Sequence, residues 1–227
     1  MLNLVTTIWQ ADTAFPNGGF AFSNGIEGLA ELGQRLDGEG LIDVLAMTLT
    51  HRWRGMDRIA VSLAFAAGDD MTRLAEIDHR FDAATISALQ RSGSRRNGLA
   101  FLTAHARIGT KTAPELKRLI EQRHTPGHLP IVQGAIWRAC GIDERSALAA
   151  SAYGVVAGMT SAAVRLSLVG AVEAQRCLGE TLPLIAGLIE GAGPAGSLSC
   201  DDFEGLTPML DIATMRHATS EIRLFSN

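Results

Sequence analysis

The sequence predicts an all-α protein, a single helical domain of about eight to ten helices with an irregular N-terminal loop and a C-terminal docking tail. Apolar residues recur at helical rather than alternating spacing through most of the 227 residues. No stretch has the alternation typical of a half-buried strand, and proline and glycine clusters fall between the helical stretches. A chain of this length can bury one sizeable core.

The first half of the chain contains three predicted helical segments. Residues 41–65 carry an amphipathic pattern that fits one helix or a kinked pair. Residues 82–107, rich in alanine and leucine, predict a second helix, in which Gly93 and Gly98 are unfavourable. A short third helix is expected over residues 112–123.

The short helix has a start signal of its own. Thr112 and Glu115 fit a capping box, and Pro114 lies in the first turn, where its missing N–H is harmless. Pro126 and Gly127 then break the chain.

Three further helices are expected in the second half, over residues 131–140, 144–168 and 172–189, with a kink at Pro183. Residues 147–164 are uncharged over about the 18 residues that a minimal membrane span requires. Small residues dominate this stretch, and Leu and Phe are nearly missing from it. The stretch therefore favours a buried helix over a membrane span.

These patterns divide the chain into three parts. Residues 1–190 form the helical domain, residues 191–204 form a flexible linker rich in Gly, Pro, Ser and Asp, and residues 205–227 form a C-terminal docking segment. The apolar residues of the last part suit a segment that gains order on a partner, or one that folds back on its own core.

Composition excludes several classes of function. The 20 Lys and Arg residues against 24 Asp and Glu residues give a net charge of -4, which provides no basic surface for nucleic acid. The three scattered cysteines form no disulfide framework and no CxxC pair, which fits a reducing cytoplasmic compartment. The N-terminus lacks the basic region of a signal peptide, and we expect no membrane association.

Enzyme motifs are incomplete. The string before Lys111 lacks the glycine and the strand of a phosphate-binding loop, and Ser23 lacks the G-x-S-x-G context of a nucleophile. His124 and His128 flank a Pro-Gly break that prevents one-face metal ligation, so a solvated turn is expected there. We therefore predict no catalytic, cofactor-binding or metal-ligating residue.

One predicted helix carries a stripe of small residues. Ala150, Gly154, Gly158 and Ala162 recur every four residues and leave one side almost without side chains. Since glycine costs about 1 kcal/mol relative to alanine in a helix interior, a close contact along the stripe is expected. That contact lies either within the core or at a dimer interface.

The N-terminal string from Trp9 to Glu27 is the most informative part of the sequence. The chain must turn at residues 16–19, and Ser23 with Asn24 can then cap a helix that has Glu27 in its first turn. This account leaves unexplained an apolar trio beside Asp12, which indicates a docking surface or an anchored turn. The trio is Phe15, Phe20 and Phe22.

Four stretches, in order, resemble those of one known family. They are the N-terminal string just described, P-I-V-Q-G-A from Pro130, the block A-A-V-R-L from Ala162 with Gly170 and Gln175, and the tail P-M-L-D-I-A-T-M-R-H from Pro208 followed by R-L-F-S. Together these stretches resemble the UreF family of urease accessory proteins. Ser167 replaces a usual proline, Ala171 a usual glutamine and Ala218 a usual glutamate.

The resemblance implies a non-catalytic, all-helical homodimer. Proteins of this family join an accessory protein of the UreD/UreH type and recruit the GTPase UreG, so that nickel reaches apo-urease during GTP-dependent activation. The tail becomes ordered on the UreD/UreH-type partner, and the dimer supplies the surface for UreG. The resemblance therefore implies that nickel is handled by the complex, through a passage proposed to conduct it, and that no cofactor is bound stably by this chain.

The matched stretches also supply candidate partner-binding residues. These are Gln10, Asp12, Phe15, Pro16, Gly18, Phe20, Ser23, Glu27, Arg165, Asp211, Met215, His217, Arg223, Leu224 and Phe225. Arg165 is either an interface arginine or a helix-terminal charge that interacts with the helix dipole. A second hypothesis is that Arg165 or Arg223 acts directly on the GTPase by stabilising transition-state charge. A third is an all-helical enzyme with a buried cofactor.

Overall fold

Every regular element that the computed structural model describes is a helix, which confirms the predicted all-α class. The structure describes residues 1–193, 195–217 and 224–225, and this part of the chain contains no strand. The α-helices are α1 (Leu2–Ala11), α2 (Ile26–Glu31), α3 (Gly38–Met47), α4 (Arg58–Ala67), α5 (Met71–Ala84), α6 (Ala88–Ile108), α7 (Ala113–Glu121), α8 (Leu129–Ala139), α9 (Glu144–Arg165), α10 (Ala171–Glu190) and α11 (Pro208–His217). Short 3-10 turns are η1 (Gly19–Ala21), η3 (Ala195–Ser197) and η4 (Cys200–Asp202), and η2 (Thr48–Asp57) is a π-helix.

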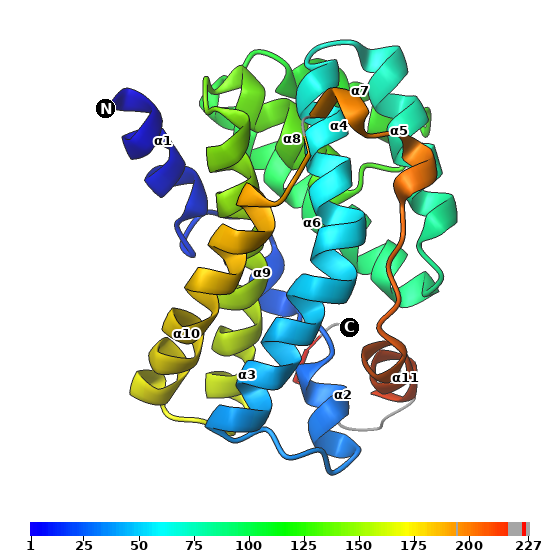
Figure 1. The fold of residues 1–227 in the computed structure, drawn as a ribbon. Coiled ribbons are helices and arrows are strands. Elements are labelled where there is room, and N and C mark those ends of the chain that lie inside the picture. Colours follow the sequence, from blue (N-terminus) through cyan, green and yellow to red (C-terminus); the bar gives the residue numbers. More distant parts are fainter. Residues whose placement is uncertain (194, 218–223, 226–227) are drawn as a thin grey trace.

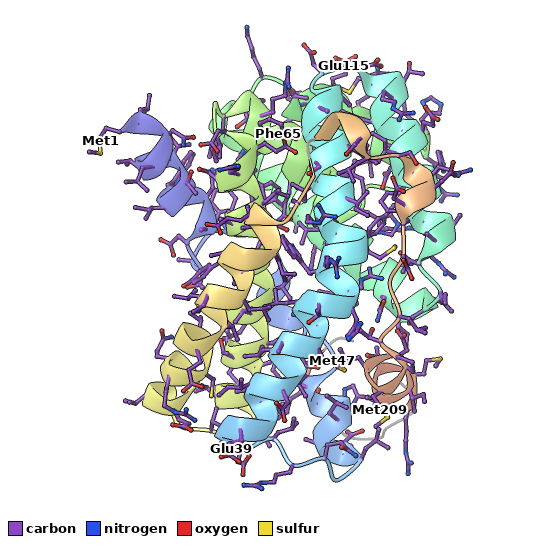
Figure 2. All side chains as sticks on the ribbon, viewed as in Figure 1. Met1, Glu39, Met47, Phe65, Glu115 and Met209 are labelled. Carbon is purple, nitrogen blue, oxygen red and sulfur yellow. The ribbon has the colours of Figure 1, made fainter. Side chains whose placement is uncertain are left out.

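The longest helical rod consists of α3, η2 and α4 and runs the length of the molecule (Figure 1). Figure 2 labels Glu39 and Phe65 near its two ends, with Met47 between them. The Asp37 carboxylate caps its start by accepting a hydrogen bond from the backbone N–H of Gly40. The alternative of one helix or a kinked pair resolves as one continuous rod whose middle is wound as a π-helix, a conformation that often marks functional sites.

The core lies where α4, α8 and α9 pack together. A Cβ at Gly134 of α8 would lie under 3.0 Å from the Val61 carbonyl oxygen of α4, so glycine is required for this approach. The indole Nε1 of buried Trp53 donates to Ser151 Oγ of α9 at 3.1 Å. Helix α9 alone among the described helices is long and apolar enough for a membrane span, with a mean hydropathy of 1.5, and 61% of that stretch is buried within the fold. This agrees with the predicted buried helix.

The helix predicted over residues 82–107 forms as α6, from Ala88 to Ile108, and only its predicted start is too early. Helix α5 ends at Ala84, and α6 begins after Ser87, whose side chain caps it by accepting from the backbone N–H of Gln90 at 3.3 Å. The hydroxyl of Thr85 donates to the Phe81 carbonyl at 2.9 Å and completes the end of α5. These local side-chain bonds stabilise a corner that apolar periodicity does not reveal.

Two predicted caps do not form. Thr112 makes no side-chain cap bond at the start of α7, because its backbone is itself helical, with φ -74° and ψ -22°. Helix α2 is preceded by Gly25 with φ 90°, not by a capping Ser23 or Asn24. Glu27 does lie in the first turn of α2, as predicted.

The segment assigned to a linker contains η3 and η4. Ser199 and Asp202 form a capping box at η4, and the Phe203 ring packs edge-on against Phe81 at a centroid distance of 5.6 Å. The backbone N–H of Glu204 donates to the Gly55 carbonyl of η2 at 2.9 Å. The segment thus lies along the helical body, and the boundaries of the three predicted parts stay predictions.

Candidate functional site

The N-terminal loop between α1 and α2 is shaped by its own polar side chains. Asp12 Oδ1 accepts from the backbone N–H of Ala14, and Asn17 Oδ1 accepts from that of Gly19, each at 2.8 Å. Gly18 has φ 74°, a left-handed conformation that favours glycine. These bonds reverse the chain over a few residues, as the sequence predicts.

The three phenylalanines of the loop have different roles. Phe15 and Phe22 are buried, and the Phe15 ring lies 5.4 Å from the Phe101 ring and 5.0 Å from the His105 ring. Phe20 is 73% exposed. The loop is therefore an anchored turn that presents one phenylalanine to solvent, and the docking surface stays a prediction.

Gln10 links the loop to the core through its side-chain oxygen. Gln10 Oε1 lies 3.0 Å from His105 Nε2 and 3.1 Å from Trp137 Nε1. Burial lowers the pKa of His105 to about 4, so its ring is neutral at pH 7. Its Nδ1 lies 2.9 Å from Thr110 Oγ1. Gln10 is thus a buried residue that links the N-terminal loop to the core.

Arg165 joins the two ends of the chain. Its guanidinium carbon lies 3.7 Å from the centroid of the Phe20 ring and 4.2 Å from that of the Phe225 ring. Its Nη1 also donates to the Phe20 carbonyl oxygen. Cation–π contacts of this kind stabilise by about 0.5–2 kcal/mol each. Arg165 therefore does more than interact with the dipole of α9.

The tail packs on α2 of the same chain. Leu210 and Ala213 of α11 are buried, and a Cβ at Gly28 would lie under 3.0 Å from the Ala213 carbonyl oxygen. The Glu27 carboxylate accepts from the backbone N–H groups of Leu224 at 2.8 Å and Phe225 at 3.2 Å. In this structure the tail adopts the alternative in which it folds back on its own core.

His217 connects α11 to α2 by contacting two carboxylates of α2, one of which is that of Glu27. It is fully buried, and its Nδ1 lies 2.9 Å from Glu31 Oε1 and its Nε2 2.9 Å from Glu27 Oε2. Glu27 thus contacts both the histidine of α11 and the backbone beyond it. This pairing needs the three-dimensional fold, because more than half the chain separates the two residues.

The candidate residues separate into exposed and buried groups. Asp12, Pro16, Gly18, Phe20, Arg165, Met215 and Leu224 are exposed, whereas Gln10, Phe15, Ser23, Glu27, His217 and Phe225 are buried. Asp211 is half-buried, and its Oδ1 accepts from Gln90 Nε2 at 2.6 Å. Burial raises the pKa of Asp211, against the opposing charge of Arg52. Arg223 and Ala218 lie outside the described residues.

The small-residue stripe does not make the close helix contact expected within this chain. A Cβ at Gly154 would meet nothing within 4 Å, and one at Gly158 would meet only Asn24 Nδ2 at 3.2 Å. Ala150 and Ala162 are buried. Both glycines instead border an open space, and Asn24 of the N-terminal loop is the nearest residue to the Cβ position of Gly158.

That open space is a cavity of about 300 Å³. Its walls come from the end of α1, the N-terminal loop, η2, α6, α8, α9 and α11. Among the residues that line it are Gln10, Asn97, Gly154 and Gly158. At η2, Arg52 Nε lies 3.7 Å from Asp57 Oδ2, and both side chains line the cavity.

The expected solvated turn at His128 is wrong. His128 is fully buried, and its Nε2 lies 2.8 Å from Asp82 Oδ1. Buried Asp78 accepts from the backbone N–H groups of Gly127 and His128, which closes the Pro-Gly break onto α5. Burial lowers the pKa of His128, while Asp78 and Asp82 oppose this shift. In the described part of the chain, no three His, Cys, Asp or Glu side chains are grouped to hold a metal ion.

Comparison with known proteins identifies the family. A model of the UreF family matches residues 36–181, more than half of the chain. The chain belongs to the UreF family.

Relatives of this family align over nearly the whole chain. Urease accessory protein UreF of Trichodesmium erythraeum is 27% identical over 225 residues, covering 96% of this chain and 94% of the relative. UreF 1 of Brucella melitensis biotype 1 is 30% identical over 219 residues, covering 95% of this chain and 89% of the relative. UreF of Bacillus sp. strain TB-90 is 26% identical over 230 residues, covering 99% of each. The relatives are named as urease accessory proteins, and this UreF chain spans most of their length.

The structure adds residues that the sequence does not identify. Gly28 and Asn97 carry no motif, and Arg52 lies in a segment whose π-helical winding has no signature in the sequence. Glu27 and His217 lie within the matched stretches, so the sequence indicates that both residues are important. It does not indicate that they contact each other.

Proposed function

We propose that this UreF chain is a non-catalytic, cytoplasmic scaffold of urease maturation. Together with a UreD/UreH-type accessory protein it recruits the GTPase UreG for GTP-dependent nickel insertion into apo-urease. The chain acts as a homodimer and binds no cofactor of its own, and nickel is the cargo of the complex.

The observation that carries this proposal is the exposed apolar surface at the tail. Leu206, Met209, Ile212, Met215 and Leu224 are 61%, 43%, 50%, 51% and 68% exposed. Met209, Ile212 and Met215 recur every three residues and so lie on one side of α11, and exposed apolar side chains grouped on one face mark protein-binding surfaces in soluble proteins. The exposed Phe20 contacts Arg165, which also contacts the tail residue Phe225, so the N-terminal loop adjoins the tail.

The test is binding of the purified UreD/UreH-type protein, measured by pull-down and titration. A chain truncated before Pro208 should lose binding. Because truncation also uncovers α2, the double variant Ile212→Ser/Met215→Ser removes exposed side chains only, and it should weaken binding at least tenfold with an unchanged melting temperature. Val172→Ser, at an 87% exposed apolar residue of α10, is the matched control. Retained binding by both tail variants would contradict the proposal.

A direct action on the GTPase through Arg165 has less support. Its guanidinium stacks between two rings of its own chain and bonds a carbonyl oxygen, so it is committed to internal contacts. GTP turnover by UreG in the presence of Arg165→Ala should therefore equal that with the unaltered chain. A large loss of turnover at equal complex concentration would favour the arginine mechanism instead.

A further inference from the structure

A fully buried histidine lies between two carboxylates where α11 meets α2. His217 Nδ1 lies 2.9 Å from Glu31 Oε1, and its Nε2 lies 2.9 Å from Glu27 Oε2. Both carboxylates come from α2, about one helical turn apart, whereas His217 is the last residue of α11. These three side chains, which we call the carboxylate–histidine trio, join the tail to the helical body.

The geometry of the trio favours a protonated ring. A neutral imidazole has one N–H, and its other nitrogen carries a lone pair. In either neutral tautomer, one electron-rich nitrogen of buried His217 would therefore lie 2.9 Å from a carboxylate oxygen. The Nε2 contact also lacks the alignment of a hydrogen bond, so it is favourable only as a contact between opposite charges.

The extra proton belongs on the ring and not on a carboxylate. Glu27 Oε1 accepts from the Leu224 N–H and Glu27 Oε2 from the Phe225 N–H, so both oxygens act as acceptors. The Glu31 side chain is 33% exposed and remains hydrated. A free imidazole is also a stronger base than a free carboxylate, by roughly a hundredfold. His217 is therefore an imidazolium between two carboxylates.

The charges that face His217 come mainly from these two glutamates. Helix α2 is described in full, and the two glutamates are its only charged residues. The other charged side chains of α11 are Asp211, which bonds α6, and Arg216, which is exposed. Arg165 packs on the tail beyond α11, at Phe225. The ring of His217 thus interacts with two negative groups of the element on which α11 packs.

Proton binding is therefore linked to docking of the tail. When α11 leaves α2, His217 enters water, where a histidine is mostly neutral above about pH 6.5. Docking above that pH takes up one proton, so it weakens as the pH rises, by up to about tenfold per pH unit. Below about pH 6.5 the histidine of an undocked tail is protonated as well, and docking no longer depends on pH.

We propose that the carboxylate–histidine trio is a pH-dependent latch for the tail. Its protonated form holds α11 on α2, and loss of the proton at higher pH releases α11. Release uncovers Gly28, against which the Ala213 carbonyl packs. The exposed apolar side of α11 then no longer adjoins Phe20, so partner binding should fall. This last step rests on the proposed function, whereas the latch itself does not.

The protonation state can be measured by ¹⁵N NMR of the histidine rings in the full chain. At pH 7.5, both ring nitrogens of His217 should show the chemical shifts of an imidazolium. Those of His51, an exposed histidine of η2, should show a mostly neutral ring at the same pH. A neutral ring at His217 would overturn the proposal.

Release of the tail can be measured by hydrogen exchange at the Leu224 and Phe225 amides, which bond Glu27. After correction for the intrinsic exchange rate, their protection should fall by up to about a hundredfold between pH 6.5 and 8.5.

Two variants separate the latch from the fold. Glu31→Gln removes the need for a second ring proton, because an amide can donate to the ring as well as accept from it. Protection of the tail amides in this variant should therefore stay constant between pH 6.5 and 8.5. His51→Gln, which removes an exposed histidine, is the control and should keep the full pH dependence. Constant protection in the unaltered chain, or an equal pH dependence in Glu31→Gln, would overturn the latch.

The effect on the partner has its own readout. Affinity for the UreD/UreH-type protein should fall at least tenfold from pH 6.5 to 8.5 in the unaltered chain and stay constant in Glu31→Gln. If tail exchange depends on pH but partner affinity does not, the partner does not require the docked tail, and this last step is wrong. If no partner binding occurs at any pH, the proposed function fails, while the exchange result still decides the latch.

Discussion

His105 is a neutral histidine enclosed by aromatic rings. The centroids of the Phe101 and Phe15 rings lie 4.4 Å and 5.0 Å from that of its own ring, and Gln10 and Thr110 lie within hydrogen-bond distance of its two nitrogens. Burial lowers its pKa from 6.5 to about 4 in the folded state. The unfolded chain therefore binds a proton between these pH values that the folded chain does not.

The first prediction concerns acid stability. The contribution of neutral His105 is fully present above pH 6.5 and is lost as the pH falls towards 4, which removes about 3 kcal/mol from the free energy of unfolding. Urea unfolding at pH 7.0, 5.5 and 4.5 measures the slope, and His105→Phe, which keeps an aromatic ring, should show a shallower one. If the free energy of unfolding fell equally steeply with pH in both proteins, the acid-dependent loss of stability would not come from His105.

The second prediction contrasts two helix glycines. Gly28→Ala places a methyl group under 3.0 Å from the Ala213 carbonyl and should destabilise the chain by about 1–3 kcal/mol, because α11 must move away from α2. Gly154→Ala meets nothing within 4 Å and should stabilise by up to about 1 kcal/mol, since alanine has the higher helix propensity. Thermal unfolding of both variants checks the prediction: the melting temperature should fall in Gly28→Ala and rise in Gly154→Ala.

These glycines show what sequence reasoning reaches at the residue scale. The every-fourth-residue spacing correctly places Gly154 and Gly158 on one side of a helix, but it does not tell what that side faces. The glycines that allow close packing, Gly28, Gly98 and Gly134, belong to no stripe. Their requirement arises from a neighbouring backbone that is distant in sequence.

At the scale of elements, the π-helix η2 and the segment after α10 depend on each other. Gly55 of η2 accepts from the Glu204 N–H at 2.9 Å, and a Cβ at Gly55 would lie under 3.0 Å from the Glu204 carbonyl oxygen. Apolar periodicity predicts the helical conformation of residues 41–65 but leaves open one helix or a kinked pair. The π winding of η2 could not be predicted, because no residue pattern in the sequence specifies it.

The third prediction tests this dependence. Gly55→Ala should displace Glu204 and raise the hydrogen-exchange rate of its amide at least tenfold, because the bond to the Gly55 carbonyl lengthens. Gly179→Ala, at an open helix position, serves as the control and should leave the Glu204 amide unchanged. Unaltered exchange at Glu204 in Gly55→Ala would mean that the segment is held by other contacts.

At the scale of the whole molecule, the two ends of the chain form one surface. Phe20 comes from the N-terminal loop and Phe225 from the tail, and Arg165 at the end of α9 contacts both rings. The sequence predicts the family, the helical class and the importance of both ends from short matched stretches. Their meeting could not be predicted, because nothing in the linear pattern relates Arg165 to either phenylalanine.

The fourth prediction concerns this three-residue clamp of Phe20, Arg165 and Phe225. Arg165→Ala removes both ring contacts and should speed hydrogen exchange at the Leu224 and Phe225 amides, which bond Glu27. The expected loss is about 1–2 kcal/mol of local stability, a five- to thirtyfold increase in rate. Arg73→Ala, at an exposed ion pair on α5, should have no effect at these amides. Unchanged exchange in Arg165→Ala would show that Glu27 alone fixes the tail.

The clamp also has a consequence for biosynthesis. Phe20 leaves the ribosome roughly 200 residues before Phe225, which at ordinary translation speeds is a delay of roughly 10–40 s. During that interval the helical body can fold, but the surface shared by the two ends cannot exist. A prematurely terminated chain would therefore be a folded body without this shared surface, and partners that bind across it would recognise only chains that include the tail.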